Sequence, residues 1–221
     1  MEPFYTFHLE LKNLNKKLLS LCAQVEERVR RAASIIKEYD EEIARSLILT
    51  DYEIDEQEVE IEEDCLKILA LHQPVASDLR FIITVIKINN ELERIGDYAV
   101  NIALRAQEIN RSPSKELLGE IDFTDMTETV TKMLKDSLDA LINRDASMAR
   151  QVFVMDEKVD AYRDYVYRII KDLLREEIED PAGLLDTYLL ARHLERVGDR
   201  TTNIAEDTIY LVDGVVARSK E

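Results

Sequence analysis

Apolar side chains recur at steps of three and four residues along most of the chain, which is the spacing of amphipathic α-helices. In the first segment this spacing runs from Leu11 through Leu14 and Leu18 to Tyr39. No stretch shows the strict alternation of apolar and polar residues that is typical of a half-buried strand. The pattern predicts helices over residues 7–39, 41–50, 51–72, 75–109, 124–143, a short piece after residue 145, then 156–178 and 182–212.

Proline and capping residues mark where several of these helices begin and end. Pro74 follows the helix that ends near residue 72, and proline disfavours helix at the residue before it. Asp180 with Pro181 is the combination of an N-cap and a first-turn proline, so a helix begins there. The segment RSPSKELLGEIDF changes composition. We predict that it links two domains, residues 1–112 and residues 113–221.

One phrase occurs twice in the chain, as ELERIGDYAVNIA at residues 91–103 and as HLERVGDRTTNIA at residues 193–205. A shift of 102 residues superimposes the two copies, and a shift of 105 superimposes DYEID at 51–55 on DEKVD at 156–160. Repetition at nearly half the chain length indicates duplication of one supersecondary unit. Because each half supplies three long helices, the sequence predicts an all-α protein of two tandem three-helix bundles with an up-down-up course.

Pairs of carboxylates lie at matched places in the two halves, and the members of each pair are four residues apart on one helical face. An antiparallel turn near residue 74 brings Asp55 opposite Glu93, and the same turn in the second half brings Asp160 opposite Glu195. Composition alone predicts roughly nine such pairs in the chain, but chance does not place four of them in matched positions. The four pairs are Asp51 with Asp55, Glu93 with Asp97, Asp156 with Asp160 and Glu195 with Asp199.

Facing carboxylates repel one another unless a proton or a cation neutralises them. Oxygen ligands without histidine or cysteine suit magnesium, calcium, manganese or iron, and they argue against zinc. We therefore predict that the eight carboxylates bind metal ions, with iron, manganese or magnesium as the candidates. Asn101 and Asn203 lie one turn beyond the aspartates and could coordinate or orient ligands, with hydrogen bonding inside the core as the alternative.

Two features of the repeated phrase have simpler explanations that the sequence leaves open. Arg94 and Arg196 could pair with neighbouring acids on a wet surface, which would need no metal. Gly96 and Gly198 interrupt their helices, each costing roughly 1 kcal/mol relative to alanine. They indicate either close approach of another backbone or room for a metal cluster.

Composition and charge exclude several classes of function. Acidic residues outnumber basic ones by 46 to 29, a formal charge of −17, which opposes nucleic-acid binding because the phosphate backbone would be repelled. No apolar run approaches 18 residues, so we expect no membrane insertion. Cys22 and Cys65 lack metal-ligand spacing, and the first residues do not form a secretory signal, so we expect a cytoplasmic protein. No catalytic triad or phosphate-binding glycine loop is present, which argues against an enzyme.

The segments LHQPVASDLRFIITVIKINNELERIGDYAVNIA and ARHLERVGDRTTNIAEDTIYLVDG resemble the PhoU family of phosphate-signalling proteins, and the likeness spans essentially the whole chain. The resemblance implies two three-helix bundles related by pseudo-twofold symmetry, a homodimer, and metal bound by the four acidic motifs. It also implies a regulator that couples the PstB ATPase of a phosphate transporter to a PhoR-type histidine kinase and restrains the phosphate-starvation response. One departure is that Leu104 and Arg105 follow the first phrase where Glu206 and Asp207 follow the second, so the two sites could differ in charge and affinity.

Two other functions stay open on the sequence alone. Paired carboxylates on helices also build carboxylate-bridged metalloenzymes, although those proteins use Glu-x-x-His units that this chain lacks. A structural helical adaptor would carry the same acids as surface decoration and would bind no metal.

Overall fold

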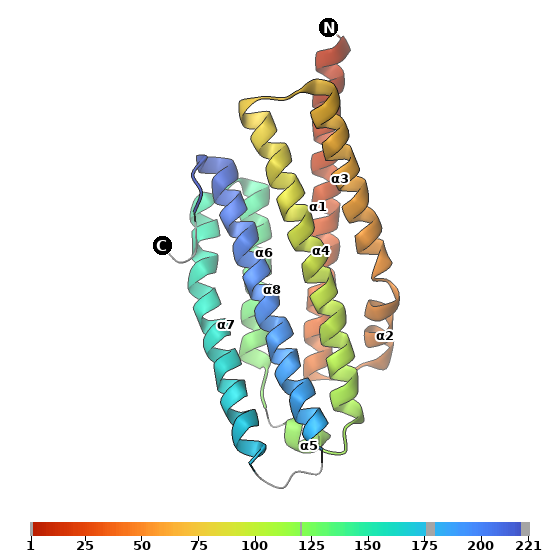
Figure 1. Cartoon of the computed structure of the whole chain (residues 1–221), viewed down its shortest axis with the longest axis vertical. Helices are drawn as coiled ribbons and strands as arrows, with labels where there is room; N and C mark the ends of the chain where they lie inside the picture. The colour runs from red at the N-terminus through yellow and green to blue at the C-terminus, as the bar shows by residue number, and fades with distance from the viewer. Residues whose placement is uncertain (1, 120, 176–179, 218–221) are drawn as a thin grey trace.

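Three long helices of the N-terminal half pack against one another: α1 (Glu2–Lys37), α3 (Tyr52–His72) and α4 (Ala76–Arg111) (Figure 1). A short helix, α2 (Glu41–Leu49), joins α1 to α3. The computed structural model describes residues 2–119, 121–175 and 180–217. The first helix begins five residues before the predicted start, because a terminal turn needs no apolar stripe to remain helical.

The C-terminal half repeats this arrangement with α6 (Thr124–Asn143), α7 (Ala146–Leu173) and α8 (Pro181–Asp213). The segment predicted as a linker contains a four-residue helix, α5 (Lys115–Leu118). The described residues form helices and connections without any strand, which confirms the all-α prediction. The predicted domain boundary after residue 112 falls between α4 and α5, and the division into two domains stays a prediction.

The second half departs from prediction in one helix. We expected a short piece after Asp145 and a separate helix over residues 156–178, but α7 is continuous from Ala146 to Leu173. Neither proline nor glycine occurs in this segment, so nothing local breaks the backbone hydrogen-bond ladder. The second half therefore lacks the break that separates α2 from α3. The predicted end of this helix falls in residues 176–179, outside the described residues.

Aspartates cap three helices, at Asp180 as predicted above and also at Asp40 and Asp145. Asp40 Oδ1 accepts hydrogen bonds from the second and third amides of α2 at 2.9 and 3.0 Å, and Asp145 Oδ1 does the same for α7 at 2.9 and 3.0 Å. Asp180 accepts from the Gly183 amide at 3.2 Å at the start of α8. These side chains satisfy amides that have no partner within their own helix.

The two halves join lengthwise along α4 and α8, which run antiparallel and form the most extensive helix pair among the described elements (Figure 1). Arg105 and Asp207, which follow the two copies of the repeated phrase, both form ion pairs in this seam. None of the described helices combines the length and apolar surface that a bilayer crossing requires. Three ion pairs cross the seam: Lys87 to Asp207 at 2.8 Å, Arg105 to Asp186 at 2.6 Å and Arg200 to Glu91 at 3.3 Å.

Candidate metal centre

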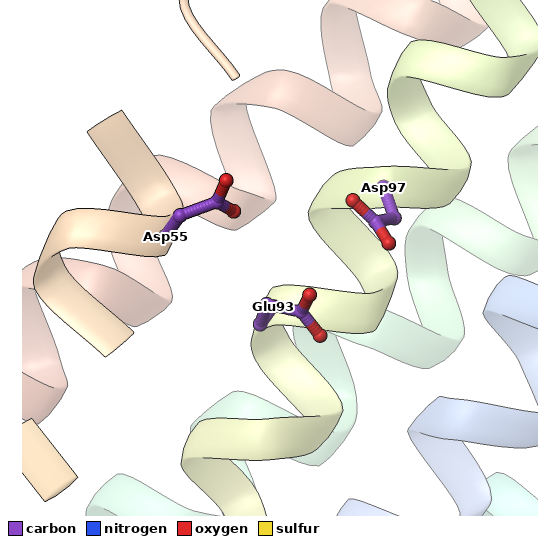
Figure 2. Close-up of side chains that lie close together, drawn as sticks. All are labelled: Asp55, Glu93 and Asp97. Atoms are coloured by element: carbon purple, nitrogen blue, oxygen red, sulfur yellow. The ribbon is translucent and has the colours of Figure 1, made fainter. Parts of the chain in front are cut away.

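Three of the predicted carboxylates meet where α3 lies beside α4. Asp55 projects from α3 toward Glu93 and Asp97, which come from successive turns of α4 (Figure 2). One carboxylate oxygen of each residue lies within 4.8 Å of the other two. Glu93 is half-buried, while Asp55 and Asp97 are exposed, so an ion from solvent can reach the cluster.

The electrostatics of this cluster favour a bound proton or cation. Burial, followed by the charges of Asp97 and Asp55, raises the pKa of Glu93 from its usual 4.5 to about 7. Burial, followed by the charge of Asp55, also raises the pKa of Asp97. Near neutral pH the three carboxylates are therefore fully ionised only at an energetic cost, which a cation between them would remove.

Asp51, the fourth predicted ligand of this half, is turned toward α1. Its Oδ1 lies 3.3 Å from Nη2 of Arg28. The same guanidinium donates to the backbone carbonyls of Leu47 and Thr50, both at 2.8 Å, and Arg28 is only 6% exposed. A buried cation thus pairs with Asp51 and also caps the last carbonyl groups of α2. The structure does not bring Asp51 into the cluster of three.

Arginines surround the corresponding glutamate of the second half. Glu195 Oε1 lies 2.7 Å from Arg192 and 3.8 Å from Arg163, and Glu195 Oε2 lies 3.8 Å from Arg196. Burial and the charge of Asp199 raise the pKa of Glu195, and the three arginines act in the opposite direction. The protein itself therefore supplies the positive charge at this position.

Two of the remaining carboxylates of the second half follow the same pattern. Asp160 lies 3.4 Å from Arg163, and Asp199 lies 3.2 Å from Arg196. Asp156 lies beside Gly198, where an added Cβ would come 3.3 Å from its Oδ1. Within the described part of the chain, these acids do not form a cluster like that of the first half. Here the geometry matches the simpler explanation, in which Arg196 pairs with neighbouring acids.

Two differences between the repeats account for the contrast. A shift of 105 places Arg163 on Glu58, and a shift of 102 places Arg192 on Asn90, so the first half has an acid and an amide where the second has cations. Arg94 of the first half donates to Asn90 Oδ1 at 3.1 Å. Sequence reasoning compared only the acids and missed these residues, although the alignment of the two repeats contained the signal.

The glycines of the repeated phrase serve close packing. An added Cβ on Gly96 would lie 3.3 Å from Cγ2 of Ile54, across the contact between α3 and α4. Gly96 and Gly198 are both buried against neighbouring side chains, so an added Cβ would be crowded at either position. Asn203 lines a surface cavity together with Glu58 of α3, and Asn101 is half-buried on α4. A part for either asparagine in metal binding stays a prediction.

A family model described as the PhoU domain matches residues 18–106 and again residues 123–208, once in each half. A phosphate-specific transport system accessory protein PhoU homolog of Clostridium acetobutylicum is 34% identical over 209 residues, which cover 94% of each chain. A protein of Pseudomonas aeruginosa with the same name is 36% identical over 218 residues, which cover 96% of this chain and 87% of the relative.

Solved structures show the same likeness in three dimensions. The crystal structure of PhoU from Pseudomonas aeruginosa superimposes with a TM-score of 0.86 at 34% identity and covers 95% of this chain and 100% of that one. The phosphate transport system regulatory protein PhoU from Streptococcus pneumoniae superimposes with a TM-score of 0.84 at 30% identity, covering 96% and 99%. With one family match on each three-helix group and relatives that align along nearly the whole chain, this protein belongs to the PhoU family.

Proposed function

We propose that this protein regulates phosphate uptake and the response to phosphate starvation as the accessory protein of a phosphate transport system. The observation that carries this proposal is the pair of PhoU matches, together with relatives named for that accessory role along at least 94% of the chain. Those relatives are accessory proteins rather than enzymes, and the same assignment holds for this member of the family.

The proposal extends to partners. The family resemblance favours a PstB-type transporter ATPase and a PhoR-type histidine kinase as the two proteins that this one couples in the cytoplasm, with a homodimer as the acting form. The formal charge of −17 supports contact with basic protein surfaces, because opposite charges steer association.

Deletion of the gene in its source organism is expected to switch on phosphate-responsive genes in phosphate-rich medium, because the restraint on the starvation response would be lost. A reporter driven by a phosphate-responsive promoter measures the change. Reintroduction of the intact gene should restore repression. Repression that persists without the protein would show that the proposed role is wrong.

We also propose that Asp55, Glu93 and Asp97 bind one metal ion. The donor set fits a hard cation, because three carboxylates from two helices converge within 4.8 Å. The raised pKa of Glu93 supports the proposal, because a bound cation would relieve the repulsion among these charges. Iron, manganese and magnesium suit an all-oxygen site better than zinc. The ion would neutralise the cluster and link α3 to α4. We confine this proposal to the first half, because arginines already neutralise the matched acids of the second.

Asp97→Asn is expected to weaken manganese binding by about tenfold or more, because it removes one charged oxygen donor. Asp199→Asn makes the same change at the matched place in the second half, where we expect less than about a twofold effect. Isothermal titration with Mn²⁺ and elemental analysis of the purified variants measure the difference. Equal losses in both variants would contradict a site restricted to the first half, and no bound metal in the unmutated protein would favour the structural adaptor.

A further inference from the structure

The outward face of α3 carries three exposed apolar side chains at two-turn spacing. Tyr52, Val59 and Leu66 are 56%, 51% and 55% exposed and are seven residues apart, so they lie on one face of the helix. The opposite face of α3 is buried through Ile54 and Ile61. Core packing therefore does not explain these residues, which together form an apolar stripe rather than scattered surface positions.

The second half provides an internal reference for this stripe. Its helix α7 occupies the same place in its own bundle as α3 does in the first, packed against the other two long helices. A requirement of the bundle fold would appear in both helices, yet the matched positions of α7 are exposed and charged. With a shift of 105, these positions are Glu157, Asp164 and Lys171.

Acidic side chains surround the stripe. Glu56 and Glu63 alternate with the apolar residues along the same face, and both are exposed. The whole of α3 contains eight acidic residues and a single lysine, Lys67. Two α3 helices from two molecules of this protein would bring like charges together, which opposes pairing along this face. A helix with basic residues beside its apolar stripe has the complementary charge.

We propose that the outward face of α3 binds an amphipathic helix of a partner protein, with an apolar stripe flanked by lysine or arginine. The seven-residue spacing suits helix-to-helix packing, in which apolar residues interlock and flanking charges select the partner. This inference goes beyond the proposed function and does not depend on it. The stripe contains none of the three carboxylates of the metal centre. Asp55 lies one turn from Tyr52 and Val59 on α3 and directs its carboxylate toward Glu93 and Asp97 of α4 (Figure 2).

The probe for this surface is a fluorescent synthetic peptide of three heptads, with leucine at the apolar positions and lysine beside them. Anisotropy titration is expected to show binding to the unmutated protein. Binding should weaken by about tenfold or more when the stripe is replaced by the residues of the second half. That variant combines Tyr52→Glu, Val59→Asp and Leu66→Lys, and circular dichroism should show unchanged helicity because α7 carries these residues in the same setting.

The matched control replaces exposed apolar residues of the second half with the same change in net charge. Affinity within about twofold of the unmutated protein is expected for it. The proposal would be overturned if peptide binding weakened equally in both variants, if it weakened in neither, or if the unmutated protein did not bind the peptide. A dimer of the unmutated protein that the stripe variant dissociates in sedimentation, with peptide affinity unchanged, would overturn it in favour of a second molecule. The control variant combines Val154→Asp, Tyr165→Glu and Leu174→Lys.

Discussion

Arg28→Met is expected to lower the free energy of unfolding by about 3 kcal/mol. The guanidinium of Arg28 is buried and donates to the carbonyl of Leu47, in the last turn of α2, and to the carbonyl of Thr50, which follows that helix. It also pairs with Asp51. The substitution leaves two carbonyls and a carboxylate without this cation in a partly buried place. Methionine fits by volume, because the second half has a fully buried Met133 at the matched position.

Urea denaturation followed by circular dichroism measures this loss. Arg30→Met is the control on the same helix, because Arg30 is exposed and its ion pair with Glu27 lies on the surface. We expect the control to change stability by less than about 0.5 kcal/mol. An Arg28→Met variant as stable as the control would show that the break between α2 and α3 holds without its buried cation.

The helices were predictable because the information that specifies them is local. Apolar residues at steps of three and four positions predicted the six long helices, and Asp180 with Pro181 gave the start of α8. The continuity of α7 was not predictable from the same pattern. In the first half a residue of α1, Arg28, stabilises the break between α2 and α3 by a contact across 19 to 22 positions, and no local pattern reveals such a contact.

The candidate site was predictable in part for the same reason. Spacing along α4 and the antiparallel turn placed Asp55 near Glu93 and Asp97, and the structure brings the three together. Whether an acid has an arginine beside it depends on side chains that come from several turns and helices. Arg192 and Arg163 decide that for Glu195, and Arg28 decides it for Asp51; none of the three belongs to the repeated phrase.

Glu93→Gln is expected to have opposite effects on stability with and without metal. Without metal, the pKa of Glu93 is about 7 in the folded protein and lower when unfolded, so the folded state retains a proton that the unfolded chain releases. Stability from this group is therefore full below about pH 4.5 and is lost as pH rises through 7. Glutamine removes that loss. We expect the variant to exceed the unmutated protein by roughly 1 kcal/mol at pH 8 in EDTA, after allowance for solvent screening, and to show little advantage at pH 4.5.

With manganese the order should reverse. An ion at a hundred times its dissociation constant stabilises the folded protein by about 2.7 kcal/mol, and Glu93→Gln loses a ligand and most of that gain. Thermal denaturation at pH 8 in EDTA and in Mn²⁺ measures both signs. The matched control is Glu195→Gln, which leaves Arg192 and Arg163 facing a neutral amide and should therefore destabilise the protein with or without metal. If Glu93→Gln behaved like this control, the cluster of the first half would be held by protein charges alone, and a metal would have no part in neutralising it.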